Sequence, residues 1–408
     1  MTINKYWPFA AVYFFVNAIA LPFGLTYMAI LGPFFYGWVV LTRRKEILLP
    51  FLLIFIPIIL AHLTFSNVDT NAYLISLVNL LLVYFFCHAV YTFLKISSGR
   101  EKIFTRLLQV NFFLCLIAIP CYFTPWYDLF WDEQTLRNGV GALRRLKMFA
   151  YEPSYYALLF TPVFCFFLLQ YLFRQNKIRG IALLVMLFLP LILSASVGVV
   201  AALMIAGILT GIIHFKKLFS KRRVLNATIN TGLGAVSILL FTFFRFRDNP
   251  VFTRIANIIA GEDSSGKGRT ADAFILAQKM LGEDHRFWGI GLGQIKIAGN
   301  DLIRDYYLYN MDVVVTIPNA VAETLAIFGW PGMVLRLLIE CSLFYVTKVW
   351  SNYYRLLLFL FMFIYQFTGS FITNAAEYVI WILAFTNVFD QFDVRPRRGL
   401  RSEGASAG

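Results

Sequence analysis

The chain of 408 residues has few charged residues, few cysteines and few histidines, and each shortage excludes a class of protein. Only 14% of the residues are charged while 59% are hydrophobic, a balance that soluble domains do not have. All five cysteines lie in apolar stretches without CxxC spacing, which disfavours disulfides and zinc sites. The four histidines form no HExxH motif, and no DxD motif accompanies them. We therefore expect neither a catalytic metal nor another cofactor.

Long apolar runs take the place of these residues. A helix needs about 20 apolar residues to cross the hydrocarbon of a membrane, and about twelve segments approach this length. They begin near Trp7, Tyr27, Ile47, Ala72, Phe104, Ser154, Gly180, Val197, Ala227, Ala320, Tyr354 and Ala375. The sequence thus predicts an all-α, polytopic helical membrane protein, with residues 1–398 as one integral membrane domain and residues 399–408 as a flexible polar tail.

The lysines and arginines sort the loops between these segments into two sets. Short basic loops recur at residues 43–45, 95–106, 174–179, 216–223, 348–355 and 395–401, as the positive-inside rule expects of the cytoplasmic side. An even number of spans places both termini on that side. The net charge of +14 is therefore mostly a topology signal, and we expect no nucleic-acid partner.

The opposite, outer side carries two long loops, residues 125–153 and 244–318, which together would form a cap. These loops hold 13 of the 36 basic residues, where the topology rule predicts few. An anionic ligand at the outer membrane face would explain them, because a guanidinium binds phosphate bidentately and stays charged. Anchoring to membrane lipid headgroups is the alternative. The candidate cations are Arg144, Arg145, Lys147, Arg269 and Arg286.

Acidic residues near the outer ends of the predicted spans are candidates for a general base. Glu152 precedes Pro153 at the start of the sixth span, where it could equally be stabilised by the helix dipole. Glu323 lies one turn into the tenth span, and a carboxylate at such depth is costly unless it is functional or paired. Glu377, at the top of the twelfth span, and His285, in the second outer loop, are lesser candidates.

Several short motifs occur together in the second half of the chain. Gly268-Arg269-Thr270 is followed by Gly289-Ile290-Gly291-Leu292-Gly293 and then by Pro318-Asn319-x3-Glu323-x5-Gly329-x2-Gly332. Tyr151-Glu152-Pro153-Ser154 adds a Glu-Pro-Ser signature. In this order and spacing, the motifs resemble the O-antigen polymerase and ligase superfamily.

The resemblance implies a glycosyltransferase of the bacterial inner membrane with a GT-C-like fold and an active site that faces the periplasm. It implies that oligosaccharide repeat units carried on undecaprenyl diphosphate are joined, with release of undecaprenyl diphosphate and without a nucleotide sugar or metal. Arg269 would hold the diphosphate, Asn319 would contact substrate, and Glu152 and Glu323 would be catalytic. A chain-length regulator is a further partner that the family suggests.

One departure from the family pattern bears on the reaction. The ligases have a histidine before the asparagine, where it is thought to activate the acceptor hydroxyl, and this chain has Pro318. The base could then be Glu152, Glu323 or His285, or positioning alone could suffice. The missing histidine favours a polymerase over the alternatives, an O-antigen ligase or a lipid-linked oligosaccharide flippase.

Overall fold

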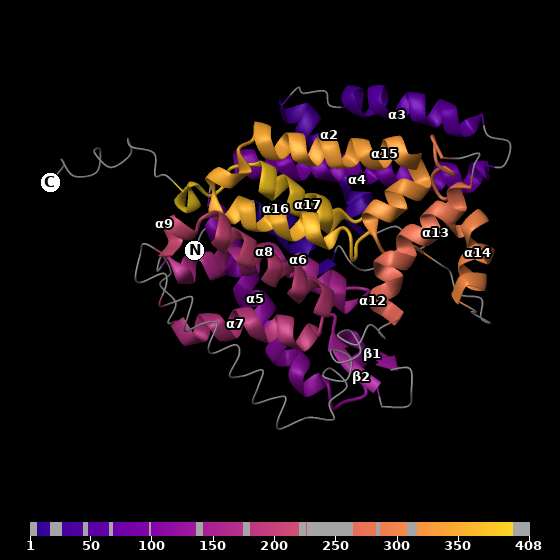
Figure 1. Cartoon of the computed structure of the whole chain (residues 1–408). Helices are drawn as coiled ribbons and strands as arrows, with labels where there is room; N and C mark the ends of the chain where they lie inside the picture. Colours follow the sequence, from indigo (N-terminus) through magenta and orange to yellow (C-terminus); the bar gives the residue numbers. More distant parts are fainter. Residues whose placement is uncertain are drawn as a thin grey trace.

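The computed structural model describes residues 6–16, 27–43, 48–64, 68–97, 99–135, 142–173, 180–219, 226, 264–282, 286–307 and 316–394, and these are mostly helical. Helices lie at eleven of the twelve positions that the apolar runs predict. The ninth predicted span, near Ala227, lies outside the described residues. The long helices run side by side in one bundle (Figure 1).

In the first half of the chain, the helices are α1 (Trp7–Ala11, followed by a π turn over Val12–Val16), α2 (Tyr27–Arg43), α3 (Leu48–Leu63), α4 (Thr70–Ile96), α5 (Arg100–Cys121), α6 (Pro153–Leu172), α7 (Gly180–Ser194), α8 (Val197–Ile213) and α9 (Phe215–Phe219). The second half holds α12 (Ser264–Arg269), α13 (Ala271–Leu281), α14 (Ala298–Tyr307), α15 (Ala320–Val346), α16 (Tyr353–Tyr365) and α17 (Ala375–Phe385). By length and apolar composition, α4, α5, α6 and α15 can each cross a membrane.

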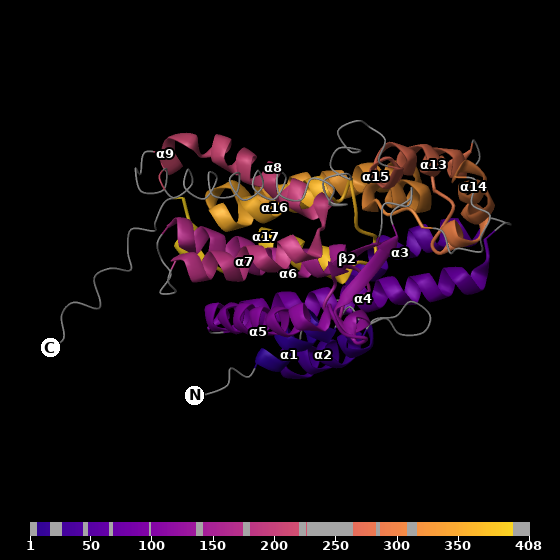
Figure 2. The same cartoon turned by 90° about the horizontal axis from the view of Figure 1, so that it is seen from below.

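The two sets of loops lie at opposite ends of the bundle. At one end, which we call the basic end, Arg100 donates to the Val388 carbonyl and the Val394 N–H donates to Ser351. The opposite, outer end carries α12, α13 and α14, on the right in Figure 1 with a β-hairpin below them, and Figure 2 shows α13 and α14 on the right as well. The assignment of the basic end to the cytoplasm stays a prediction.

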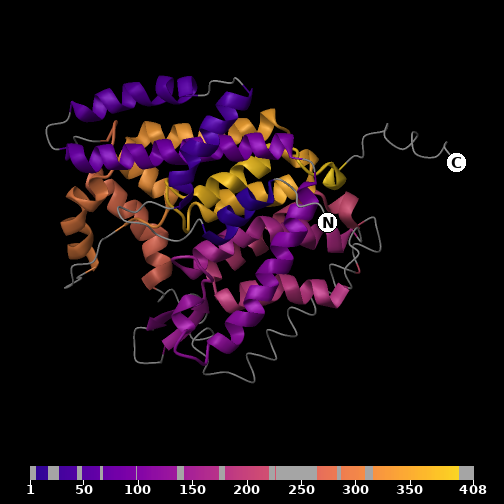
Figure 3. The same ribbon diagram turned by 180° about the vertical axis from the view of Figure 1, so that it is seen from behind.

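Two apolar clusters form the core. The larger surrounds α6, which is buried along most of its length and packs against α7 and α16 through residues such as Phe160, Phe166 and Phe361. The smaller joins α13 to α15 through Ala277 and Leu325. Seen from behind, the orange helices of the second outer loop and the hairpin both lie away from the C-terminus (Figure 3).

The hairpin is the one place where the described residues depart from the all-α prediction. Strands β1 (Trp131–Thr135) and β2 (Ala142–Leu146) pair antiparallel, with Glu133 opposite Arg144 and Trp131 opposite Leu146. The buried Trp131–Leu146 pair and the oppositely charged pair stabilise this short ladder. Charged residues interrupt the apolar alternation in this segment, so the sequence pattern does not predict strands here.

Candidate active site at the outer end

Asn319 joins three segments at the outer end. It is the N-cap of α15, where its side-chain oxygen accepts the Ala322 N–H at 2.9 Å. Its side-chain nitrogen donates to the Arg269 carbonyl at 2.9 Å and to the Phe367 carbonyl at 2.7 Å. The side chain is fully buried. Asn319 therefore fixes the end of α12, which carries Arg269, against the start of α15 and the segment after α16.

Glu152 reaches the same place from α6, of which it is the N-cap. Ser154 Oγ donates a short hydrogen bond to the Glu152 carboxylate. Tyr365, at the end of α16, is buried, and the charges of Arg269 and Glu152 both act on it. Glu152 and Arg269 thus both influence Tyr365, and they form no ion pair among the described contacts.

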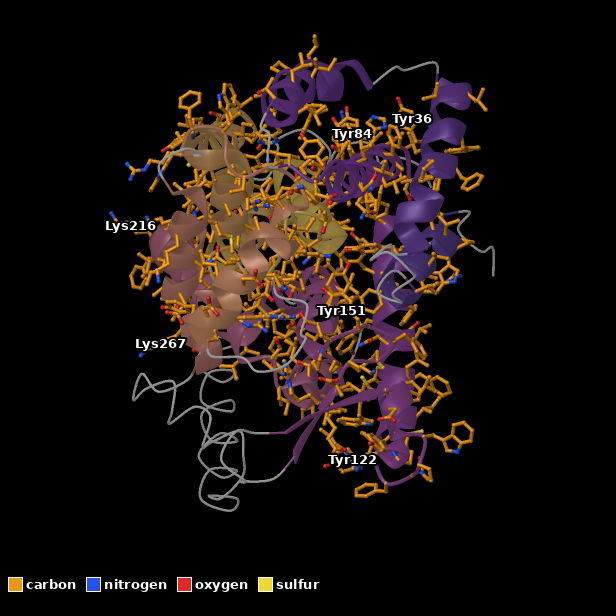
Figure 4. The ribbon with its side chains drawn as sticks, turned by 90° about the vertical axis from the view of Figure 1, so that its right-hand side faces the viewer. Tyr36, Tyr84, Tyr122, Tyr151, Lys216 and Lys267 are labelled. Carbon is orange, nitrogen blue, oxygen red and sulfur yellow. The ribbon has the colours of Figure 1, made fainter. Side chains whose placement is uncertain are left out.

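Tyr151 borders this group of residues. It is 44% exposed, and in Figure 4 it lies near the middle of the molecule, to the right of Lys267 and above Tyr122. Desolvation and the neighbouring Glu152 carboxylate raise the pKa of Tyr151 well above its ordinary value, while Arg269 acts in the opposite direction. The hydroxyl is therefore a neutral hydrogen-bond donor at neutral pH.

Glu323 lies on α15, four residues after Asn319. Its carboxylate accepts the backbone N–H of Ile372 at 2.7 Å. Ile372 belongs to the loop between α16 and α17, residues 366–374, so Glu323 holds this loop against α15. The loop is tied to the site a second time, because Asn319 binds the carbonyl of Phe367.

Glu377 is completely buried and forms an ion pair with Arg336 of α15. It also accepts hydrogen bonds from Ser370 Oγ at 2.6 Å and Trp381 Nε1 at 3.3 Å. Arg336 also forms an i,i+4 ion pair with Glu340, at 3.1 Å. Glu377 is thus engaged in an internal ionic network.

The cations of the first outer loop contact the hairpin and its surroundings. Arg144 forms an ion pair with Glu133 at 2.9 Å and lies 3.9 Å above the centre of the Tyr127 ring. Arg145 is buried and donates to the Ser194 carbonyl at the end of α7 at 3.2 Å. Lys147 follows β2 and is half-buried. These contacts connect the hairpin to α7 rather than to the group around Arg269.

The Gly-x-Gly-x-Gly turn has a structural partner in α15. That helix is kinked at Gly329, where φ is +67°, and the turn supplies N–H groups to the carbonyls at the kink. Ile290 donates to Ala326 at 2.9 Å and Gly291 donates to Ile327 at 3.1 Å. At Gly289, where φ is +79°, a Cβ atom would lie 2.2 Å from the Ile327 carbonyl oxygen. The glycines therefore permit a close backbone approach to α15.

Arg286, the remaining candidate cation, lies at the contact between the glycine turn and α15. Its side chain is exposed and donates to the Gly282 carbonyl at 3.0 Å, and its own carbonyl accepts the Trp330 N–H just beyond the kink. The neighbouring candidate, His285, lies outside the described residues.

The structure joins Arg269 to Asn319 by a hydrogen bond, with Glu323 four residues later on α15, and the charges of Arg269 and Glu152 both act on Tyr365. It adds Tyr365 and the loop after it, which charge patterns did not indicate because this segment carries no ionisable group besides the tyrosine. A polar run from Gln366 to Asn374 between two apolar helices was the available signal. Within the described residues, no three His, Cys, Asp or Glu side chains lie close enough to hold a metal ion.

Fold and site define a helical membrane protein with a cluster of charged and hydroxyl side chains at one end. Residues 181–337 match a family model described as O-Antigen ligase, which confirms the resemblance to the O-antigen polymerase and ligase superfamily. The matched stretch runs from α7 into α15 and contains Arg269, the glycine turn, Asn319 and Glu323. Members of this family are enzymes. No curated protein matches the chain.

Proposed function

We propose that this protein is a polysaccharide polymerase that joins oligosaccharide units carried on undecaprenyl diphosphate at the outer face of the membrane that it spans. A hydroxyl of one unit attacks the anomeric carbon of another. A glycosidic bond forms, the bond from that carbon to the diphosphate oxygen breaks, and undecaprenyl diphosphate leaves. The hydroxyl proton passes to a base on the protein.

The position of Arg269 carries this proposal. Its side chain has no ion-pair partner among the described acidic residues, its carbonyl is held by Asn319 at the outer end, and its charge acts on Tyr151 and Tyr365 as that of Glu152 does. Negative charge develops on the departing diphosphate in the transition state. A guanidinium already in place stabilises that charge without having to reorganise, and it can bind two phosphate oxygens at once.

Glu152 is the base in this scheme. Its carboxylate accepts only the Ser154 hydroxyl among the described hydrogen bonds, so it retains acceptor capacity for a substrate hydroxyl. Glu323 instead binds the loop between α16 and α17 through Ile372, which suits a positioning role. Pro318 stands where the ligases have their histidine, and this supports chain polymerisation over transfer to a second acceptor.

The test uses purified protein in lipid, with synthetic undecaprenyl-diphosphate oligosaccharide as the sole substrate and product size read on a gel. A polymerase produces a ladder spaced by one repeat unit. Glu152→Gln keeps the size of the side chain and removes its basicity, so it should reduce the rate of ladder formation by about a hundredfold or more. A wild-type reaction without a ladder would contradict the proposed polymerisation.

The ligase remains the second candidate, because the matched family model is described by that activity. Adding a lipid A-core acceptor to the same reaction separates the two. Transfer of a single unit to this acceptor, with no ladder in its absence, would assign the protein as a ligase.

A further inference from the structure

Arg336 connects the two halves of the kinked helix α15 to the helices that follow it. Before the kink, its Nη1 donates to Thr324 Oγ1 at 3.2 Å, and after the kink its Nε donates to Glu340 at 3.1 Å. The same guanidinium binds Glu377 of α17, and its Nε also donates to the side-chain oxygen of Gln366, at the end of α16, at 3.0 Å. We call Arg336 and these four partners the Arg336 network.

Gln366 is the member of this network that lies closest in the chain to the candidate site. It is fully buried, and its amide is used at both ends: the oxygen accepts from Arg336, and the nitrogen donates to Glu340 at 2.7 Å. A buried amide that is held by two partners keeps one orientation, and this fixes the backbone at the end of α16. The next residue is Phe367, whose carbonyl accepts the side chain of Asn319 at 2.7 Å.

Asn319 continues this path to Arg269. The side-chain nitrogen of Asn319 has two N–H donors, and these bind the Phe367 and Arg269 carbonyls, while its side-chain oxygen accepts the Ala322 N–H. The ring of Phe367 adds a second contact, because it stacks on Phe274 of α13 with 6.5 Å between ring centroids. Helix α13 begins two residues after Arg269. A displaced Phe367 would therefore either break these contacts or move Arg269.

The loop between α16 and α17, residues 366–374, is also held by the network at a second point. Ser370 has a φ of +72°, a conformation that costs energy for a residue other than glycine. Its Oγ donates to the Glu377 carboxylate at 2.6 Å, and Glu377 is the ion-pair partner of Arg336. The charged network therefore fixes this loop both at its first residue and near its middle.

We propose that Gln366 is a positioning residue for Arg269 and that the Arg336 network fixes its orientation. The contacts run from Arg336 to the Gln366 side chain, along the backbone to the Phe367 carbonyl, and through Asn319 to the Arg269 carbonyl. No proton moves along this path, which only sets where the Arg269 guanidinium meets the diphosphate. The inference rests on the proposed function, in which Arg269 binds the leaving diphosphate, and it adds a residue from outside the stretch that matches the family model.

The experiment compares two buried amides at opposite ends of α16. Gln366→Met keeps the length of the side chain and removes both hydrogen bonds. Asn352→Leu is the matched control, because Asn352 is fully buried, caps the start of α16 and donates to the Phe389 carbonyl at 2.9 Å at the basic end. We expect both variants to unfold at a lower temperature than wild type. Only Gln366→Met should also lower kcat in the ladder assay, by between about tenfold and about a hundredfold, as for a misplaced catalytic group.

The preference for undecaprenyl diphosphate over undecaprenyl monophosphate is a readout that lower stability alone does not change. Gln366→Met should lose part of the wild-type preference, whereas Asn352→Leu should keep it. In an Arg269→Ala background, Gln366→Met should have no further effect on the preference, because the group that it positions is absent. A wild-type preference and kcat in Gln366→Met would overturn the positioning role, and so would a loss of preference that is equally large with and without Arg269.

A second variant tests the same path if Gln366→Met does not fold. Glu340→Gln keeps the size of the side chain but leaves one acceptor oxygen where Arg336 and Gln366 now use two. It must also lose part of the diphosphate preference, or the proposal is wrong. A wild-type protein that prefers the diphosphate but makes no ladder would refute the polymerase alone, and the binding comparison would still decide the role of Gln366. A wild-type protein without the preference would contradict the role of Arg269 and this inference with it.

Discussion

Two arginines, 67 positions apart in the chain, show how differently this protein uses the same side chain. Arg336, in the middle of α15, contacts Glu340, Glu377, Gln366 and Thr324. Arg269, at the end of α12, has its carbonyl held by Asn319 but forms no described ion pair through its guanidinium. The guanidinium of Arg336 is thus surrounded by protein acceptors. The backbone of Arg269 is held in place, but its guanidinium forms no ion pair with a described residue.

The difference follows from burial. A charge within apolar helices has a large desolvation cost, so Arg336 is retained only with acidic partners and hydrogen bonds around it. Arg269 lies half-buried at the outer end, where water can solvate it until an anionic ligand arrives. An arginine whose donors all bind protein acceptors therefore indicates a structural role, and an arginine with donors left for a ligand indicates a binding role. Substitutions at both kinds of residue test this contrast.

The largest effect on activity is expected for Arg269→Ala. Loss of a preplaced donor for the leaving group should lower the rate of polymer formation by about a thousandfold, while membrane insertion and thermal unfolding stay as in wild type. Lys267→Ala, on the same helix and exposed, is the matched control and should retain the normal rate. A normal rate for Arg269→Ala would show that Arg269 does not stabilise the leaving diphosphate.

The largest effect on stability is expected for Glu377→Ala. It leaves Arg336 with a missing partner in a buried environment, which should lower the free energy of unfolding by about 3–5 kcal/mol. Denaturation in detergent measures this, with Glu377→Gln as a milder control that keeps hydrogen-bonding capacity toward Ser370. An Ala variant as stable as wild type would show that the Arg336 network does not hold α15 and α17 together.

The glycine turn offers an intermediate effect. Gly289→Ala places a Cβ atom against the Ile327 carbonyl in a left-handed conformation, and it should destabilise the protein by more than the about 1–3 kcal/mol of backbone strain alone. Gly282→Ala is the control, because φ there is also positive, at +52°, but no atom lies within 4 Å of the added carbon. Equal unfolding temperatures for the two variants would contradict a stabilising role of the close contact between the glycine turn and α15.

The smallest effect is expected for Arg144→Ala. This arginine already contacts Glu133 and Tyr127 on the exposed hairpin, so its removal should leave the polymerisation rate and the KM for the lipid-linked donor close to wild type. A large rise in KM would show that Arg144 binds the lipid-linked donor and is not only a structural residue of the hairpin.

The apolar runs predicted the helices well, since eleven of the twelve predicted positions carry one. The motifs in the second half of the chain pointed to Arg269 and Asn319, which the fold joins by a hydrogen bond. Tyr365 was not among the predicted residues because it is one of 21 tyrosines and precedes an uncharged loop. The sequence does not indicate the ion pair of Glu377 with Arg336, because the two residues are 41 positions apart in the chain. Such long-range pairs leave no local pattern.

The most direct test of the central claim, that Arg269 holds the leaving diphosphate, is a binding measurement that does not require turnover. The affinities of undecaprenyl diphosphate and undecaprenyl monophosphate are compared for wild type, Arg269→Ala and Lys267→Ala in lipid. We expect wild type and Lys267→Ala to prefer the diphosphate, and Arg269→Ala to lose most of that preference. A full preference for the diphosphate in Arg269→Ala would contradict the account.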